Sequence, residues 1–589
     1  MIRAFLLLLL PVVLISQPRV PDWARDAVWY QIFPERFRNG DPTNDPLAAE
    51  LKLDPPRKWR LSPWTSDWYK LQPWEKTHDA DFYDNVFDRR YGGDLQGVLD
   101  KLDYLADLGV NAIYFNPIFE ALSLHKYDAS TYHHIDNNFG PDPPGDMVLI
   151  ASETEDPSTW KWSAADRVFL NLMSEAHRRG IRIILDGVFN HCGTEFWAFQ
   201  DVVKHQQRSR YADWFDIKTW DDPNTSQNEF DYKGWWDYKG LPEFREGENG
   251  FVQPVWKYFF DITRRWMDPN GDGDPTDGID GWRLDVANDV SHHFWREWRG
   301  LVKSINPEAY IVGEIWDDAS TWLKGDEFDA VMNYRFSRAM IRFFADTGSQ
   351  RYTVTAFNEE LADIRQGYPG DVNYVLQNLI DSHDTDRWSS MILNPNRNYD
   401  HDNGLRNNRD YNVAKPGDRE RQILKLMALF QMTYVGAPMM YYGTESGMWG
   451  ADDPDDRKPM VWDDLTYEDE RTHPFGMPRA ADHVSFDHNL FSYFKKLIAA
   501  RNTYSALRRG TYRPLIMNND DNIYAFERQD MKGRVIVVLN NSSRPGVVAL
   551  AGHESLYDIL TETTINSSGI SLRPKSGMIL VSSLQSLPD

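Results

Sequence analysis

Short apolar runs alternate with longer amphipathic segments through most of the chain. Seven segments have the apolar spacing of helices, at 95–108, 164–179, 252–266, 291–303, 352–366, 418–432 and 487–501. Eight runs have the length and composition of buried strands, at 27–33, 111–115, 181–186, 279–285, 309–314, 328–332, 374–381 and 437–442. Eight strands alternating with helices predict an α/β fold built on a (β/α)8 TIM barrel.

Two regions depart from this alternation. Residues 192–250 have no regular period and are rich in Trp, Asp, Lys and Gly, which predicts a small subdomain inserted after the third strand. After about residue 508, short alternating segments such as 522–528 and 534–539 predict a C-terminal antiparallel β-sandwich domain. The expected division is an export signal at 1–17, a barrel domain at 18–507 and the β domain at 508–589.

The N-terminus has the pattern of an export signal. A positive start at Met1-Ile2-Arg3 precedes an apolar run from Phe5 to Ile15, which is too short to cross a bilayer. We therefore expect a secreted or periplasmic protein without a transmembrane anchor. Cys192 is the only cysteine, so no intrachain disulfide is possible.

The charge balance narrows the class of partner. Lys and Arg number 64 against 89 Asp and Glu, a formal net charge of −25. This excess argues against nucleic acid and anionic membrane, because both select basic surfaces. It does not bear on a neutral ligand. The 23 Trp and 28 Tyr include more aromatic rings than a core needs, and such rings stack well on the apolar faces of sugars.

Charged residues recur where the predicted strands end. They are Asp186, Arg283, Asp285, Glu314 and Asp384, with His191 and His383 in the loops that follow. Active sites of barrels lie at the C-terminal ends of the strands, so these side chains should meet in one cleft. Several carboxylates brought together repel one another, which favours a chemical role over a folding role.

A pair of carboxylic acids in different surroundings predicts cleavage of a glycosidic bond. Arg283 precedes Asp285 by two residues and shares its strand face, so it should keep Asp285 ionised as a nucleophile. Glu314 lies between apolar residues, and apolar surroundings suit a general acid. The alternative from this stretch alone is a structural ion pair of Arg283 with Asp285.

Four segments together resemble the conserved motifs of the α-amylase family of glycoside hydrolases. They are 186–191 (DGVFNH), 281–285 (GWRLD), 313–316 (GEIW) and 382–385 (SHDT). The resemblance implies a retaining mechanism with Asp285 as nucleophile, Glu314 as acid/base and Asp384 as a stabiliser that holds sugar hydroxyls. It also implies a set of sugar-binding residues, namely Tyr127, Asp186, His191, Arg283 and His383.

Two further segments are similar to those of the neopullulanase and cyclomaltodextrinase branch. Residues 286–289 (VAND) have Asp where that branch has Glu, and 240–244 (GLPEF) is an intermediate form, so bond preference stays open. The N-terminal β domain of some relatives is missing from this sequence, which leaves oligomeric state and substrate size open.

A turn-rich loop near the first strand is rich in oxygen ligands. Alone it is typical of a surface turn, but it is similar to a structural Ca²⁺ site of relatives. The residues of that site are Asn39, Asp41, Asn44, Asp45, Gly92 and Asp94.

The expected function is an exported α-glucan hydrolase. It would cleave α-1,4 and, as a second class, α-1,6 links in maltooligosaccharides, cyclodextrins, pullulan or starch. One alternative is a transglycosylase or isomerase that passes the same covalent intermediate to a sugar. Another is a catalytically silent glycan-binding homologue, which the joint presence of Asp285, Glu314 and Asp384 disfavours.

Overall fold

The computed structural model describes residues 20–53, 58–77, 81–401, 403–552 and 554–582. Eight parallel strands form its central sheet, in the order β10-β9-β8-β3-β2-β1-β12-β11. A parallel bridge between Met332, directly after β10, and Gln377 in β11 closes this sheet into a barrel. The strands are β1 (Trp29–Ile32), β2 (Ala112–Phe115), β3 (Arg182–Gly187), β8 (Gly281–Leu284), β9 (Tyr310–Gly313), β10 (Ala330–Val331), β11 (Gln377–Asn378) and β12 (Ala437–Tyr441). The predicted fold class is confirmed.

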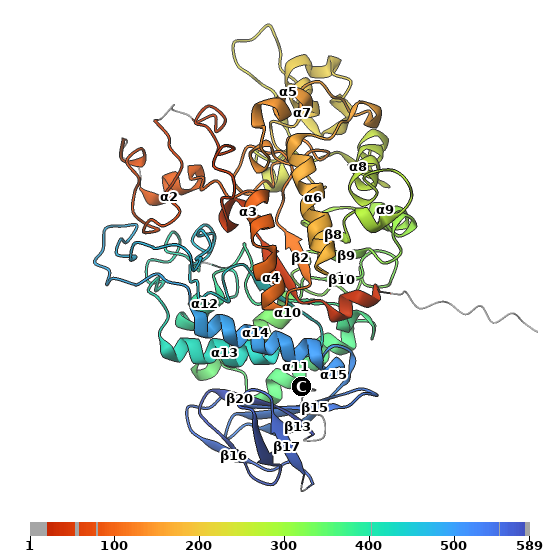
Figure 1. The fold of residues 1–589 in the computed structure, drawn as a ribbon. Helices are drawn as coiled ribbons and strands as arrows, with labels where there is room; N and C mark the ends of the chain where they lie inside the picture. Colours follow the sequence, from red (N-terminus) through yellow and green to blue (C-terminus); the bar gives the residue numbers. More distant parts are fainter. Residues whose placement is uncertain (1–19, 54–57, 78–80, 402, 553, 583–589) are drawn as a thin grey trace, which may run out of the picture.

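The barrel strands are apolar along their whole length because both of their faces are covered. Every residue of β1, β2, β8, β9 and β12 is buried. Helices surround them (Figure 1). They include α6 (Ala164–Arg178), α8 (Gln253–Met267), α9 (His292–Ile305), α11 (Val354–Gly367), α13 (Asp418–Thr433) and α14 (His488–Thr503). All six lie within a few residues of their predicted ranges.

Two differences from the prediction concern helices that pack around the barrel. The segment predicted as one helix at 95–108 is α3 (Leu95–Asp100) and α4 (Leu102–Leu108), separated at Lys101. A further helix, α10 (Tyr334–Phe344), was not predicted, although Asn333 caps it by accepting a hydrogen bond from the Phe336 N–H. Eight of its residues are buried, and its three arginines recur at intervals of three and four residues on the less buried side, so the helical period was present in the sequence and was overlooked.

The insertion after β3 lies at the opposite end of the molecule from the C-terminal sheets (Figure 1). It contains α7 (Trp197–His205) and two short hairpins. Their strands are β4 (Ile217–Thr219), β5 (Asp231–Tyr232), β6 (Glu246–Gly247) and β7 (Gly250–Phe251). A bridge joins His191 to Glu243, so the insertion is tied to the segment that follows β3.

The C-terminal strands form an uneven sandwich. The larger sheet has the order β13-β14-β15-β20-β17-β18 and the smaller sheet pairs β16 with β19. The strands are β13 (Thr511–Asn518), β14 (Ile523–Gln529), β15 (Arg534–Asn540), β16 (Gly546–Val548), β17 (Ser555–Asp558), β18 (Thr563–Asn566), β19 (Ile570–Leu572) and β20 (Ser576–Ser582). Ile536 and Val548, one from each sheet, belong to a shared apolar cluster. Phe526 packs edge-on against Phe430 of α13, which joins these strands to the barrel.

The predicted export signal at 1–17 lies outside the described residues. Among the residues that are described, no helix combines the length and apolar character needed to cross a membrane.

Candidate active site

A cavity of about 790 Å³ opens at the C-terminal ends of the barrel strands. Its wall contains all three predicted catalytic carboxyls, Asp285, Glu314 and Asp384. It also contains three of the predicted sugar-binding residues, Tyr127, His191 and His383. Asp186 and Arg283 lie behind this wall. Arg283 contacts Asp285 and Glu314, and Asp186 accepts a hydrogen bond from the Tyr127 hydroxyl.

Strand register brings the charged residues together. Asp186 in β3 pairs with Arg283 in β8, and Leu284 pairs with Gly313 in β9. Asp285 and Glu314 directly follow these two paired positions, and the Glu314 N–H donates to the Leu284 carbonyl at 2.9 Å. Neighbouring parallel strands that end at the same level therefore present both carboxyls at one edge.

Arg283 is the centre of the charge cluster. Its Nη1 lies 2.9 Å from both carboxylate oxygens of Asp186 and 2.8 Å from Asp285 Oδ1. Its Nη2 lies 2.9 Å from Glu314 Oε2. Asp285 Oδ2 accepts no hydrogen bond from the described residues, so this oxygen remains for a ligand in the cavity.

One guanidinium cannot neutralise three buried carboxyls. Burial raises the pKa of Asp285 well above its usual range, and although Arg283 opposes this shift, the nearby Glu314 reinforces it. Burial and Glu314 likewise raise the pKa of Asp384 to about 7, against the opposing effect of Arg457. The predicted effect of Arg283 on Asp285 is present, but burial outweighs it. The titrations of Asp285 and Asp384 are therefore coupled to the charges of their neighbours.

The prediction that Glu314 lies in apolar surroundings is wrong. Its Oε2 accepts from the Val286 N–H at 2.9 Å, and its Oε1 accepts from the Trp316 indole N–H at 3.1 Å. Together with Arg283, these donors make the surroundings of Glu314 as polar as those of Asp285. The polarity of their surroundings therefore does not distinguish the general acid from the nucleophile. The assignment of these two roles rests on the motif resemblance.

Val286 has a strained backbone, with φ 38° and ψ 45°. A β-branched residue rarely adopts this left-handed conformation, because Cβ crowds the neighbouring backbone. The conformation directs the Val286 N–H toward Glu314. Such strain is typical of functional sites, where surrounding structure holds a group in a required position.

Tyr127 and His383 form a stacked pair on the cavity wall. Their rings are nearly parallel, at 6°, with centroids 5.4 Å apart. Gln31 Nε2 lies 2.9 Å from His383 Nδ1, and burial lowers the pKa of His383 well below its usual range. His383 is therefore neutral and carries its proton on Nε2, 2.5 Å from the Tyr127 hydroxyl. That hydroxyl donates in turn to Asp186 Oδ2 at 3.1 Å.

Gln31 was missed by the sequence analysis. It lies in β1, whose apolar neighbours dominate the pattern, and it is fully buried. A lone buried amide inside a barrel strand is the signal that could have identified it, because buried polar groups need partners.

A pair of tryptophans in the insertion was also missed. Trp235 stacks on His191 with ring centroids 5.4 Å apart, and Trp236 stacks on Trp235 at 4.9 Å. Both line the cavity, and Trp236 is 82% exposed. Burial lowers the pKa of His191 to about 3, and its Nε2 has no hydrogen-bond partner among the described residues. A neutral imidazole beside exposed aromatic faces suits a sugar.

The predicted calcium residues lie together at the start of α3. Asp94 caps this helix and accepts from the backbone N–H groups of Gly40, Asp41 and Gly97. Asn39 Nδ2 donates to Asp45 Oδ1 at 2.6 Å.

Several observations fit a cation in this loop. Among the described residues, the buried oxygens Asn39 Oδ1 and Asn44 Oδ1 have no hydrogen-bond donor. Burial and the nearby carboxylates, Asp94 first among them, raise the pKa of Asp45 to about 6. Gly92 has φ 75°, and a Cβ there would lie 2.2 Å from Asp45 Oδ1, so only glycine leaves room for these ligands. Unpaired oxygens and crowded carboxylates are what Ca²⁺ would satisfy.

Comparison with known proteins places the chain in one family. A family description, "Alpha amylase, catalytic domain", matches residues 31–152 and 164–510. The chain is 40% identical to neopullulanase 2 of Thermoactinomyces vulgaris over 568 residues, covering 95% of the chain and 78% of the relative. It is 37% identical to a cyclomaltodextrinase of Thermoanaerobacter pseudethanolicus over 565 residues, with the same coverage.

A solved structure shares the architecture. The ligand-free cyclic α-maltosyl-(1→6)-maltose hydrolase of Arthrobacter globiformis matches with a TM-score of 0.70 and 29% identity. The match covers 96% of this chain and 100% of that enzyme.

Proposed function

This chain belongs to the α-amylase family of glycoside hydrolases, and from this premise we propose that it is an exported, retaining α-glucan hydrolase. Its relatives identify it as an enzyme of neopullulanase and cyclomaltodextrinase type. Its substrates are α-1,4-linked maltooligosaccharides, cyclodextrins, pullulan or starch, with α-1,6 links as a second bond class. The observation that carries the proposal is the convergence of Asp285, Glu314 and Asp384 on one cavity of about 790 Å³.

The proposed reaction has two displacement steps. An Asp285 oxygen forms a bond to the anomeric carbon while the glycosidic C–O bond breaks, and Glu314 gives its proton to the leaving oxygen. Ionised Glu314 then takes a proton from water, whose oxygen displaces Asp285 from the anomeric carbon. Asp384 holds hydroxyls of the distorted sugar, and the Tyr127–His383 pair stacks against it.

The charges around the cleaved bond are held by one cation. Asp186, Asp285 and Glu314 share the guanidinium of Arg283, so their mutual repulsion is only partly offset in the free protein. Substrate binding displaces water from the cavity and strengthens these interactions.

We also propose a structural Ca²⁺ ion in the loop before α3. Asn39, Asn44 and Asp45 would hold it, with Asp41 and Asp94 adding negative charge nearby and Gly92 leaving space. The ion would join this loop to the start of α3 and takes no part in the chemistry. Export rests on the N-terminal sequence pattern.

The proposed function is tested by product analysis of purified protein with pullulan, β-cyclodextrin, starch and maltotriose. Panose from pullulan, or cyclodextrin opened faster than starch, supports the hydrolase of neopullulanase type. Release of the α-anomer, followed by proton NMR at early times, supports retention. Absence of turnover on all four substrates by folded, calcium-loaded protein would contradict the proposal and favour the glycan-binding alternative.

Transglycosylation is the second candidate because of the Trp235–Trp236 stack. Exposed aromatic faces at the cavity wall could hold a sugar acceptor where water would otherwise react. Products longer than maltotriose, formed from maltotriose alone, would favour transfer over hydrolysis.

A further inference from the structure

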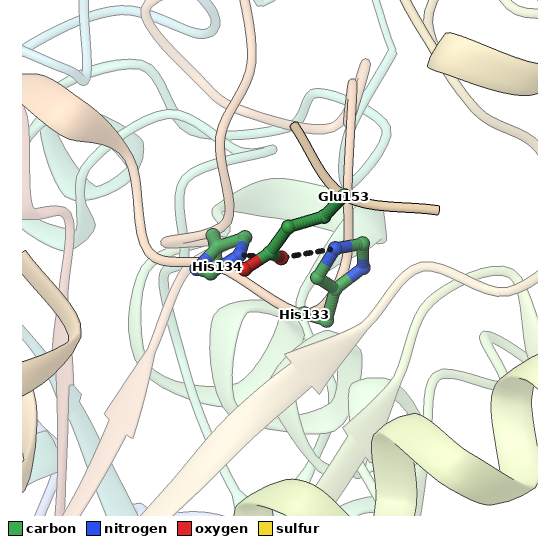
Figure 2. Close-up of side chains that lie close together, drawn as sticks. All are labelled: His133, His134 and Glu153. Atoms are coloured by element: carbon green, nitrogen blue, oxygen red, sulfur yellow. Dashed lines mark hydrogen bonds and ion pairs between the residues drawn. The ribbon is translucent and has the colours of Figure 1, made fainter. Parts of the chain in front are cut away.

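Two histidines and a glutamate lie close together in the connection between β2 and α6. None of the three belongs to the proposed catalytic or sugar-binding residues. Figure 2 shows the Glu153 carboxylate between the rings of His133 and His134. Glu153 Oε2 lies 2.7 Å from His134 Nε2 and 3.4 Å from His133 Nε2. Within the described parts of the chain, these three side chains form the one group of His, Cys, Asp or Glu with three ligand atoms all within 4.8 Å of one another.

The remaining ring nitrogens already have partners. His134 Nδ1 lies 2.8 Å from Asp166 Oδ2, so its proton is directed away from Glu153. His133 Nδ1 lies 2.8 Å from the Thr131 hydroxyl and 2.9 Å from that of Tyr258. The Asp166 contact leaves the His134 Nε2 lone pair turned toward Glu153. At His133 the hydroxyls of Thr131 and Tyr258 can either donate to Nδ1 or accept from it, so Nε2 is free to present a lone pair when Nδ1 carries the proton. A lone pair that faces an anion repels it unless a proton or a metal ion lies between them.

We propose that His133, His134 and Glu153 bind one divalent first-row transition metal ion, with zinc as the expected ion. Imidazole and carboxylate are ligands that zinc prefers, and ligating histidines commonly donate their other N–H to a carboxylate, as His134 does to Asp166. Zinc–nitrogen bonds of about 2.0–2.1 Å place tetrahedral ligands about 3.4 Å apart. The His133–Glu153 separation of 3.4 Å meets this value, and Glu153 must move away from His134, now at 2.7 Å, by about 0.7 Å.

A fourth ligand can be water. Glu153 borders a cavity of about 500 Å³ that is also lined by Ser130 and Trp197. The three side chains are themselves almost fully buried, at 2% or less. A buried ion with a small opening to solvent indicates a structural site and not a catalytic one.

The ion would anchor a segment that lies between the two parts of the family match. Glu153 begins the stretch 153–163, which falls outside the match to the family. In this stretch Trp160 stacks on His133 with centroids 4.4 Å apart, and the Lys161 N–H donates to Glu153 Oε1 at 2.7 Å. Asp166 belongs to α6 and Tyr258 to α8. The site therefore joins the inserted stretch to two barrel helices.

The same site supports the active-site wall. Tyr132 precedes His133, and its hydroxyl donates to the main-chain carbonyl of His191. An ion that holds His133 therefore also holds the Tyr132 contact with a residue of the substrate cavity.

The competing explanation is an ion pair without metal, in which His134 carries a second proton between Asp166 and Glu153. Measurements on the full chain, prepared in a fixed excess of calcium, distinguish the metal site from this ion pair. We expect about one zinc per chain by elemental analysis, and a Tm lowered by about 2 °C or more on treatment with phenanthroline and restored by zinc. The Glu153→Gln and His133→Gln proteins should retain no zinc and show neither change.

His177→Gln is the matched control, because His177 also pairs with a buried carboxylate, Asp280, at 2.7 Å but has no third ligand. The His177→Gln protein should retain zinc, and its Tm should respond to phenanthroline and to added zinc as that of the unaltered protein does. Cobalt added to stripped, unaltered protein should give the visible absorption of a four-coordinate site, which decides the question even if a variant fails to fold. No cobalt spectrum and no retained zinc, or zinc binding undiminished in Glu153→Gln, would overturn the proposal.

Discussion

At the scale of single residues, Arg283 determines the charge balance of the site. It contacts Asp186, Asp285 and Glu314 through one guanidinium, and all four side chains are buried. Removing this cation would leave three buried carboxyls without a counter-charge, a strongly destabilising change. Carboxyl-to-amide substitutions are more informative, because they remove charge while keeping volume.

Asp285→Asn and Glu314→Gln should each lower kcat by about 10³-fold or more, because each removes a group that forms a bond or moves a proton. Their Tm values should stay within a few degrees of the unaltered protein. Steady-state kinetics on maltotriose and thermal melting check both statements. Asp317→Asn, a change in an exposed carboxylate of the same cavity wall, is the control and should retain activity. Near-normal turnover by either active-site variant would refute its assigned role.

Asp384→Asn should stabilise the free protein at high pH. Because the pKa of Asp384 is about 7 instead of 3.8, the folded protein binds a proton that the unfolded chain releases. Its contribution to stability is therefore fully present below about pH 4 and is lost as pH rises through about 7. We expect the variant's Tm to exceed that of the unaltered protein by about 2 °C or more near pH 8, and by less near pH 5. An equal Tm difference at both pH values would show that ionisation of Asp384 does not destabilise the folded protein.

Trp236→Ala should weaken binding of longer substrates without altering the chemistry. Loss of one stacking surface costs about 1 kcal/mol, which is about a fivefold increase in KM. The kcat on maltotriose and the Tm should change little, because Trp236 is 82% exposed. Tyr238→Ala, a nearby exposed aromatic at 65% exposure, serves as control. If both variants raise KM equally, the stack has no specific part in binding.

At the scale of elements, the connections that follow the barrel strands carry the active-site residues and the contacts that hold those residues in place. The β8–α9 connection holds Asp285 and strained Val286, and the β3–α8 connection holds His191 and the tryptophan pair. The loop after β1 meets the start of α3 at the proposed calcium site. Rigid strands fix the starting points of these loops, whereas hydrogen bonds fix their paths.

Removal of calcium should lower Tm, since an ion bound only by the folded state stabilises it. Differential scanning with EDTA, followed by calcium or zinc added back separately, distinguishes this loop from the histidine cluster. Asp45→Asn should weaken the response to calcium alone. Asp268→Asn is the matched control, because Asp268 lies in an acidic turn where it accepts from the Gly271 and Gly273 N–H groups at 3.0 and 3.1 Å. A melting curve that does not change when calcium is removed or added back would exclude the calcium site in this loop.

At the scale of the whole molecule, the net charge of −25 should not affect catalysis on neutral glucans. Electrostatic steering requires a charged ligand, and salt screens only such interactions. We therefore expect kcat/KM on maltotriose to change less than about twofold between low and high salt. A steep salt dependence measured in initial-rate assays would instead indicate that charges rearrange when substrate binds.

Much of the architecture could be predicted from the sequence because its signals are local. Buried parallel strands are continuous apolar runs, and helices between them have a 3.6-residue period, so strands such as 181–186 and helices such as 164–179 are evident from neighbours alone. Helix α10 has the same period, with arginines at intervals of three and four residues along its less buried side, and was overlooked. The predicted residues that line the cavity were found because each ends a recognisable strand or lies in a familiar motif, whereas Trp235 and Trp236 have neither signal.

The set of elements, the family resemblance and the charged residues at the strand ends can therefore be recognised from the order of residues alone. Which of those charges share a partner depends on the folded arrangement. It showed that Glu314 has polar contacts, that Gln31 orients His383, and that Glu153 meets His133 and His134 from 20 and 19 residues away. The physical reason is distance: pKa values and ligand sets depend on atoms within a few ångströms, and folding brings such atoms together from distant positions in the chain.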